Sequence, residues 1–184
     1  MMTKSELRKI NKEKRAAMKD AEVKEKSLAI AKTFLDSEIY KNAKTIMAYM
    51  PLGNEVDTRE IILSAFSDGK CVVVPITDAE SGEITPCAIE KDETFQKGAF
   101  SILEPLSKRI ADPQQIDIVL VPGVAFDKKG GRVGFGKGCY DRFLKKTDAL
   151  KIGLCYDFQL CDMIDEESHD IKMDFVITEN VNSI

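Results

Sequence analysis

The chain has 184 residues, of which 43% are hydrophobic and 32% are charged. This length allows one compact domain with a buried core, and the composition excludes a disordered or fibrous protein. The net charge of −4 at pH 7 argues against a nucleic-acid-binding protein, whose affinity depends on neutralising backbone phosphates. We therefore expect a single globular domain over residues 1–184 that binds no nucleic acid.

The hydrophobic pattern predicts helices and strands that alternate along the chain. Apolar residues first recur at helical spacing near the N-terminus, where Thr3 or Ser5 can cap a helix. Residues 116–121 form a continuous run of apolar β-forming residues, which is typical of a strand buried on both faces. The pattern is weaker between residues 77 and 114, where we expect one strand and a loop at Glu104-Pro105. The expected helices span residues 3–19, 22–36, 57–66 and 138–146, and the expected strands span residues 45–50, 71–76, 84–89, 116–121, 151–155 and 175–178.

This alternation predicts an α/β fold, in which a mostly parallel sheet with helices on both faces forms the middle of three layers. Ligands of such sheets bind at the carboxyl ends of the strands. The sequence has no internal repeat, no low-complexity tract and no run of 18 apolar residues, so we expect neither a domain linker nor a membrane contact. Nothing in the sequence predicts an oligomer, and a monomer is our expectation.

The cysteine pattern bears on the cellular compartment. The five cysteines are odd in number and include no C-x-x-C pair, which favours reduced thiols over a disulfide framework or a zinc site. The basic N-terminus lacks the apolar segment of a signal peptide, and Glu6 and Glu13 are unusual in a transit peptide. We expect a cytoplasmic protein.

Charge is distributed unevenly along the chain. Residues 3–26 contain nine Lys or Arg and five Asp or Glu, whereas residues 157–174 contain one Lys and seven Asp or Glu. The two segments could meet around an anion and its metal ion. Two separate solvent-exposed faces explain the same pattern more simply, and we take them as the expectation.

Glycine is concentrated in one short segment. Residues 130–141 contain five of the 11 glycines, which alternate with Arg132 and Lys137 and precede Tyr140 and Asp141. Glycine loses more backbone entropy on folding than any other residue, so this cluster is costly unless it has a function. Backbone N–H groups that closely approach an anion would explain it, because a Cβ atom would collide there. The segment therefore predicts a phosphate-binding loop, with a flexible surface loop as the alternative.

Two common phosphate-binding motifs do not fit this segment. Gly131 to Lys137 matches the first seven positions of a P-loop, but Gly138 stands where Ser or Thr would bind Mg²⁺. The segment also begins nine residues after its strand ends, whereas a P-loop follows its strand directly. A dinucleotide-binding fingerprint fails as well, because its last glycine position holds Cys139. The closely spaced N–H donors, a lysine and the start of a helix remain as features that favour an anion.

Two motifs in the middle of the chain carry a family resemblance. They are Val-Pro-Gly-Val-Ala-Phe-Asp at residues 121–127 and Gly-Arg-Val-Gly-Phe-Gly-Lys-Gly-Cys-Tyr-Asp at residues 131–141. This combination resembles the 5-formyltetrahydrofolate cyclo-ligases, also called methenyltetrahydrofolate synthetases. The inferred architecture resembles that of the sugar-phosphate isomerase and CoA-transferase superfamily. Weaker matches occur in the family's order, across nearly the whole chain, at residues 4–8, 49–51, 55–58, 104–105, 169–170, 174 and 178.

The resemblance implies an enzyme that converts 5-formyltetrahydrofolate and ATP into 5,10-methenyltetrahydrofolate, ADP and phosphate, with a polyglutamylated folate as a further candidate substrate. The formyl group is an amide, so its carbon is a poor electrophile and its oxygen a poor leaving group. Transfer of the γ-phosphoryl group to that oxygen allows N10 to attack the formyl carbon and phosphate to leave. Positioning and charge neutralisation are the protein's tasks in such chemistry.

Family roles can be carried over to the matching positions of this sequence. The resemblance implies that Lys137 and Arg132 act in catalysis and that Asp141 and Asp174 bind Mg²⁺. It places ATP against Lys4, Arg8, Arg132, Gly134, Phe135, Gly136, Lys137, Gly138, Cys139 and Tyr140. It places the folate against Met50, Glu55, Phe135, Gly136, Lys137, Gly138 and Cys139, with the Glu55 carboxylate accepting hydrogen bonds from the pterin amino and ring N–H groups.

Several of these residues also have a simpler interpretation. Lys4 and Arg8 lie four residues apart on one helix face, which is equally typical of a solvent-exposed surface. Met50 fits a hydrophobic core as well as a folate pocket. Asp141 fits the first turn of a helix, and Asp174 fits an exposed charge beside a strand.

The chain departs from the family pattern at two positions. Phe135 stands where Arg is common, and Cys139 replaces the first of two usual tyrosines. Lys137 and the two candidate metal ligands are kept, so we expect activity to persist. The departures put substrate affinity and the preference for polyglutamate tails in question.

Two other functions compete with a cyclo-ligase. A sugar-phosphate isomerase or CoA-transferase-like enzyme would use its own base or nucleophilic Glu and would need neither ATP nor an Mg²⁺ pair. A non-catalytic nucleotide- or folate-binding module would keep the loop. The loss of Lys137 or Asp141 would have indicated such a module, but both residues are present. The only histidine, His169, is accompanied by no nucleophile motif, and we interpret it as structural or peripheral.

Overall fold

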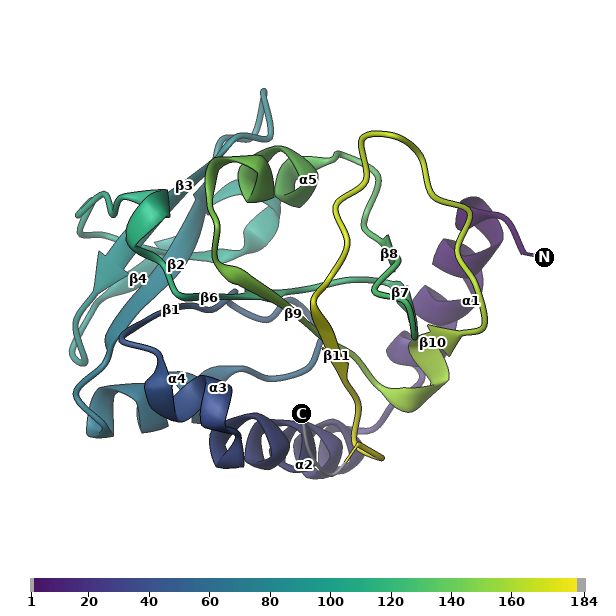
Figure 1. The fold of residues 1–184 in the computed structure, drawn as a ribbon, viewed down its shortest axis with the longest axis horizontal. Coiled ribbons are helices and arrows are strands. Elements are labelled where there is room, and N and C mark those ends of the chain that lie inside the picture. Colours follow the sequence, from purple (N-terminus) through teal and green to yellow (C-terminus); the bar gives the residue numbers. More distant parts are fainter. Residues whose placement is uncertain (1, 182–184) are drawn as a thin grey trace.

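A six-stranded sheet forms the centre of the computed structural model, which describes residues 2–181 (Figure 1). The helices are α1 (Lys4–Ala16), α2 (Asp20–Asp36), α3 (Glu38–Asn42), α4 (Arg59–Ser67) and α5 (Cys139–Phe143). The strands are β1 (Thr45–Met47), β2 (Cys71–Thr77), β3 (Ile84–Ile89), β4 (Phe95–Lys97), β5 (Leu103–Pro105), β6 (Ile118–Val121), β7 (Ala125–Asp127), β8 (Arg132–Val133), β9 (Leu150–Leu154), β10 (Leu160–Cys161) and β11 (Phe175–Ile177). The strand order is β11-β9-β6-β1-β2-β3, and every pair is parallel except β2 and β3.

The central strands bury side chains on both faces of the sheet. In β6, Ile118 and Leu120 belong to the core beneath α2 and α4, whereas Val119 and Val121 belong to the core beneath α5. All four are at most 1% exposed, because successive residues of a strand point to opposite faces. Figure 1 shows α2, α3 and α4 on one side of the sheet and α5 on the other. The predicted α/β architecture, with a mostly parallel sheet between helices, is confirmed.

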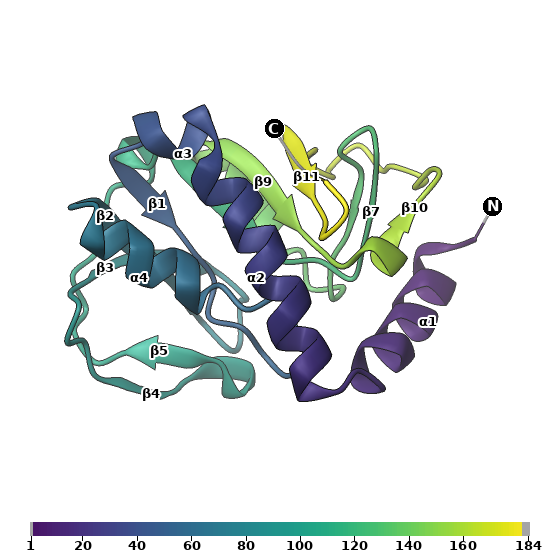
Figure 2. The ribbon, with the colours of Figure 1, turned by 90° about the horizontal axis from the view of Figure 1, so that it is seen from below.

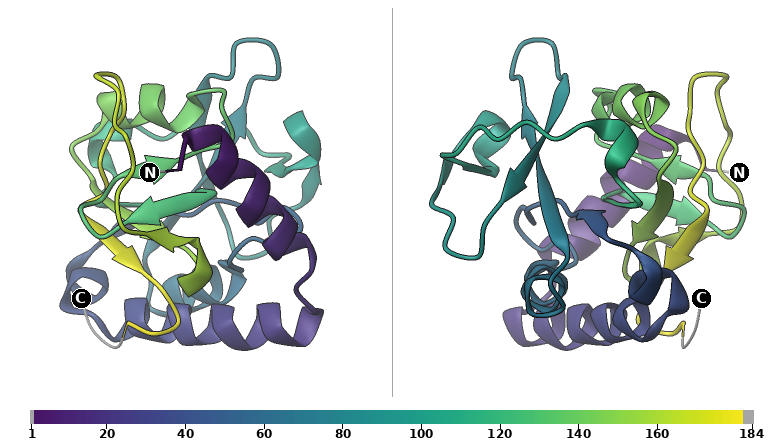
Figure 3. Two further views of the ribbon diagram at one scale, coloured as in Figure 1. Left: turned by 90° about the vertical axis from the view of Figure 1, so that its right-hand side faces the viewer. Right: turned by 60° about the vertical axis from the view of Figure 1, so that its left-hand side comes forward.

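The helix α1 lies outside these layers, against a small sheet of order β10-β7-β8. The Thr3 hydroxyl accepts a hydrogen bond from the Glu6 N–H (3.2 Å), and the Glu6 carboxylate accepts one from the Thr3 N–H (2.8 Å). On the buried face of α1, Leu7 packs among apolar residues, and the Asn11 amide donates to the Val124 carbonyl (3.0 Å). Figure 3, left, shows α1 crossing in front of the green strands of this sheet. This packing turns one face of α1 toward the strand ends.

Several predicted boundaries differ from those of the structure. The first strand ends at Met47 rather than at residue 50, because residues 48–50 follow the strand as irregular backbone. The helix expected at 138–146 ends at Phe143 and continues as a 3₁₀ turn. The loop expected at Glu104-Pro105 is wrong, because these residues form β5, which pairs with β4 in a hairpin (Figure 2).

The described residues, 2–181, include no helix that is both long and apolar enough to cross a membrane.

Candidate functional site

A cavity of about 550 Å³ opens where β1, β2 and β6 end. This size lies within the range of small-molecule sites, and the carboxyl edge of the sheet is where the sequence predicted a ligand. Five segments form the walls: α1, the strand ends, the β4–β5 hairpin, the glycine loop over residues 132–141, and an acidic loop over residues 165–170. Its lining residues include Lys4, Arg8, Tyr49, Met50, Glu55, Thr77, Phe100, Ile102, Pro122, Arg132, Gly134, Phe135, Gly136, Lys137, Gly138, Cys139, Tyr140, Asp141, Glu167, His169 and Asp170.

The glycine loop is held in place from two sides. Its carbonyl at Gly134 accepts a hydrogen bond from Arg8 Nε of α1 (2.8 Å). Its carbonyl at Lys137 accepts one from Arg142 Nη1 (2.9 Å), and the same guanidinium donates to the turn between β2 and β3. The backbone at Gly138, just before α5, has φ = 63°, a conformation that disfavours any side chain. The backbone conformation at this position therefore explains why residue 138 is a glycine.

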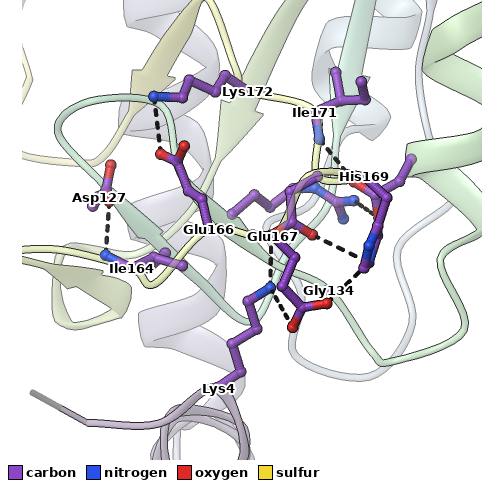
Figure 4. A network of polar contacts seen from close by, with 12 residues as sticks. Lys4, Asp127, Gly134, Ile164, Glu166, Glu167, His169, Ile171 and Lys172 are labelled. Carbon is purple, nitrogen blue, oxygen red and sulfur yellow. Dashed lines mark hydrogen bonds and ion pairs between the residues drawn. The ribbon is translucent and has the colours of Figure 1, made fainter.

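The basic N-terminal helix and the acidic C-terminal segment meet at this cavity (Figure 4). Lys4 Nζ donates to Asp170 Oδ2 (2.6 Å) and lies 3.3 Å from Glu167 Oε1. Burial lowers the pKa of Lys4, but the hydrogen bonds and charges of the two acids outweigh it and raise that pKa. The expectation of two separate solvent-exposed faces is wrong at this contact. His169 lies beside the same acids at the rim, with its side chain 60% exposed.

Arg132 is the buried cation of the glycine loop. Its Nη2 donates to Asp141 Oδ2 (2.9 Å), and its Nη1 donates to the Pro122 carbonyl (3.3 Å). Its Nε is the one buried side-chain nitrogen or oxygen within residues 2–181 that has no hydrogen-bond partner. A buried donor without a partner is costly, which makes this atom a marker for an anionic or polar ligand.

Lys137 is the exposed cation of the glycine loop. Its ammonium sits 3.9 Å above the centre of the Phe100 ring, which reaches the cavity from the turn between β4 and β5. Phe100 and Ser101 have φ values of 55° and 64°, and two successive non-glycine residues in this region indicate a strained backbone. The hairpin is anchored where the Glu104 carboxylate accepts the Thr77 N–H (2.9 Å). Sequence reasoning missed Phe100, since residues 77–114 show no clear periodicity.

The carboxylate of Glu55 is the deepest acid of the cavity. Its side chain is 7% exposed, and its Oε2 accepts a hydrogen bond from the Leu52 N–H (2.9 Å). Burial raises the pKa of Glu55, against the opposing effects of that N–H and of Arg15, whose Nη1 lies 3.8 Å from Oε1. Met50 and Tyr140 lie on the same cavity, and burial also raises the pKa of the Tyr140 phenol. A buried acceptor beside an apolar wall suits a flat, donor-bearing ring.

The structure does not bring the two candidate metal ligands together. Asp141 lines the cavity, where its Oδ1 accepts a hydrogen bond from the Ile171 N–H (3.3 Å) in addition to the Arg132 contact. Asp174 does not line the cavity: its carboxylate accepts the Lys151 N–H (2.7 Å) at the start of β9. Within residues 2–181, no group of three or more His, Cys, Asp or Glu side chains is arranged to hold a metal ion.

Comparison with known proteins identifies the family. The sequence profile of the 5-formyltetrahydrofolate cyclo-ligase family matches residues 1–179. The chain belongs to this family. It is 31% identical to the 5-formyltetrahydrofolate cyclo-ligase of Mycoplasma genitalium over 96% of this chain and 98% of that protein. The family predicted from the motifs is therefore confirmed, and it is a family of ATP-dependent ligases.

Solved structures of cyclo-ligase family members have the same fold. The 5,10-methenyltetrahydrofolate synthetase of Aquifex aeolicus superposes with a TM-score of 0.87 at 33% identity, covering 98% of this chain and 91% of that one. The synthetase of Mycoplasma pneumoniae superposes with a TM-score of 0.78 at 29% identity, covering 97% and 100%. Both superpositions cover nearly the whole of this chain, the central sheet included.

Proposed function

We propose that this protein converts 5-formyltetrahydrofolate and ATP into 5,10-methenyltetrahydrofolate, ADP and phosphate in the 550 Å³ cavity. One observation carries the proposal: four cations and one buried carboxylate converge on this space from three parts of the chain. The cations, Lys4, Arg8, Arg132 and Lys137, suit a triphosphate, whereas Glu55 suits the donor edge of a pterin.

The residues present fit ATP. Among residues 2–181, the buried Nε of Arg132 has no hydrogen-bond partner, and the exposed Lys137 ammonium lies over the Phe100 ring at the cavity. A phosphate oxygen would give the Arg132 Nε a charge-assisted hydrogen bond, and it is a stronger partner for the Lys137 ammonium than the Phe100 ring. ATP supplies the phosphoryl group that turns the formyl oxygen into a leaving group. We assign to Lys137 the offsetting of negative charge as that group is transferred, and to Arg132 the orientation of the phosphates.

Asp141 fits an Mg²⁺ ion that the nucleotide phosphates help to bind. It lines the cavity, and each of its oxygens accepts one hydrogen bond from the protein and retains a further lone pair. Mg²⁺ is commonly held by one or two carboxylates together with phosphates and waters, and it neutralises phosphate charge. Asp174 stays a prediction of the resemblance, because its carboxylate is engaged at Lys151.

Substrate recognition is assigned to the deep end of the cavity. The Glu55 carboxylate accepts hydrogen bonds from the amino and ring N–H groups of the pterin, and Met50 packs against the ring. Closure of N10 on the formyl carbon needs the two groups held in near-attack geometry, which a 550 Å³ cavity with an aromatic wall at Phe100 supports.

The proposal is tested by mixing purified protein with 5-formyltetrahydrofolate, Mg²⁺ and ATP and following the absorbance of methenyltetrahydrofolate. We expect a signal that requires ATP and the folate together, and no conversion under these conditions would overturn the proposal. Repeating the assay with a polyglutamylated substrate measures the tail preference.

The free thiols of all five cysteines support a cytoplasmic location. Light scattering in solution checks the expected monomer.

A further inference from the structure

Arg15 is a buried cation that faces the folate end of the cavity from behind. It lies in the last turn of α1, and its side chain is only 12% exposed. Its Nη1 lies 3.8 Å from Glu55 Oε1, and it is the one cation within 4.0 Å of that carboxylate among the described residues. Arg15 does not line the cavity itself. Any effect of Arg15 on a ligand in the cavity is therefore indirect.

Three contacts fix Arg15 in this position. The Asn54 amide donates to the Arg15 carbonyl (2.9 Å) and to the Met18 carbonyl (3.1 Å), which ties the end of α1 to the turn that carries Glu55. On the other side, the Arg15 guanidinium carbon lies 5.5 Å from the centre of the Phe135 ring, a cation–π distance. Phe135 lines the cavity, so a single guanidinium links the deep carboxylate to the glycine loop.

The surroundings of Glu55 make this cation important. The phenols of Tyr49 and Tyr140 also lie within reach of the Glu55 charge, and burial together with that charge raises their pKa values, so both phenols are neutral. The Leu52 N–H is its backbone donor. Neutral phenols and one N–H compensate a buried negative charge only weakly, and a buried carboxylate without a cation tends to take up a proton.

We propose that Arg15 is a positioning residue of the folate site, which keeps the Glu55 carboxylate ionised and oriented so that it accepts hydrogen bonds from the pterin. This inference rests on the proposed function. A carboxylate has about four acceptor positions. The Leu52 N–H occupies one and Arg15 approaches a second, which leaves at least two for the pterin amino and ring N–H groups.

The direction of the effect follows from burial. Burial raises the pKa of Glu55, and Arg15 opposes that rise. Removing Arg15 therefore moves this pKa further up, toward neutral pH, and a protonated Glu55 would turn a donor toward the donor edge of the pterin. As the pH falls, folate affinity is therefore lost at a higher pH than in the wild type, whereas Lys137 and Arg132, the cations assigned to the phosphates, keep their contacts.

The test is binding of 5-formyltetrahydrofolate in the absence of ATP, measured by calorimetry across pH 5–9, with steady-state kinetics beside it. For Arg15→Met we expect an acidic limb of the binding profile moved up by about one pH unit, and a Kd that is higher by up to about tenfold at the pH values of that limb. The KM for the folate should rise with the Kd, while the KM for ATP and kcat stay near the wild-type values. Arg15→Lys keeps the charge and should restore most of the acidic limb.

A matched control is Lys14→Met. Lys14 is the neighbouring cation on α1 and lies near the Phe158 ring, 5.9 Å from its centre, rather than near Glu55. Its removal should leave the Kd and the pH profile unchanged. A double variant gives a second test. In a Glu55→Gln background, Arg15→Met should weaken binding no further, because the carboxylate charge that Arg15 stabilises is already absent.

The proposal is overturned if Arg15→Met leaves both Kd and acidic limb unchanged, or if Arg15→Met and Arg15→Lys lower the melting temperature equally and share one pH profile. The wild type separates this failure from that of the proposed function. Absence of ATP-dependent conversion by the wild type would reject the proposed function itself, and absence of folate binding by the wild type would reject both.

Discussion

The carboxylate of Asp127 organises the turn that leads into the glycine loop, and its removal should destabilise both turn and loop. Asp127 is 1% exposed. Its Oδ1 accepts the backbone N–H groups of Lys129 (2.8 Å) and Gly131 (2.9 Å), and its Oδ2 accepts that of Ile164 (2.9 Å). The turn immediately precedes Arg132, so a displacement of the turn would also displace this cavity residue.

The magnitude follows from which N–H groups lose their partner. In Asp127→Ala the buried N–H groups of Gly131 and Ile164 are left unpaired, whereas that of Lys129 is near the surface and can bind water. An unpaired buried donor costs about 1–3 kcal/mol, so we expect a total loss of about 4 kcal/mol. In Asp127→Asn the remaining side-chain oxygen can still accept the N–H groups of Lys129 and Gly131. Only the N–H of Ile164 loses its acceptor, because the amide NH₂ group takes the place of the second oxygen. This variant should therefore lose only about 2 kcal/mol.

Urea denaturation gives the free energy of unfolding of each variant by linear extrapolation. Asp92→Asn, at an exposed position, serves as the control and should match the wild type. The reasoning is refuted if Asp127→Ala costs less than about 1 kcal/mol, below one unpaired donor. It is also refuted if Asp127→Asn costs as much as Asp127→Ala. That result would mean that the two carboxylate oxygens do not accept different N–H groups.

Three further predictions concern the site and its support. Lys137→Ala should lower kcat by at least about 100-fold in the absorbance assay, with an unchanged urea midpoint, because its side chain is exposed; an unfolded variant with normal activity per folded molecule would contradict this. Gly153→Ala should cost about 2 kcal/mol in urea denaturation, because its Cβ would lie 2.5 Å from the Phe126 ring, and Phe126→Leu should recover part of that loss. Burial raises the pKa of Asp170, but hydrogen bonds from a backbone N–H and from Lys4 outweigh it, so the folded-state pKa is lowered. Such a contact stabilises above the unfolded pKa of about 4 and is lost as the pH falls. The difference in urea midpoint between wild type and Asp170→Asn should therefore shrink from pH 7 to pH 3, and a constant difference would count against the contact.

The fold was predictable where burial leaves a periodic pattern. The strand Ile118–Val121 is apolar throughout because both of its faces are covered, and the helix Asp20–Asp36 shows its buried face as helical spacing. The hairpin of β4 and β5 was missed because it lies at the edge of the molecule. The residues of Phe95–Lys97 are at least partly exposed, so their sequence carries no burial signal.

Much of the candidate site was recognisable because its chemistry is concentrated in one segment. Glycines, cations and a carboxylate within residues 130–141 indicated an anion site, and the structure places residues 134–141 and Arg132 around one cavity. Arg15 and Phe100 gave no such signal. Each lies in a segment whose local pattern fits an ordinary helix turn or loop, and only the tertiary structure shows that Phe100 lines the cavity and that Arg15 lies 3.8 Å from Glu55.

Local sequence was thus sufficient for most strands of the central sheet and for the family, since these depend on neighbouring residues, and it predicts that the glycine loop binds phosphate. Packing settled which charged groups meet. It joins Lys4 to Asp170, 166 residues apart, and Arg132 to Asp141, while it leaves Asp174 at Lys151. Such pairings depend on how the layers and loops pack around the sheet. No local pattern can specify that, because the energy of a distant contact is gained only once the whole fold brings its partners together.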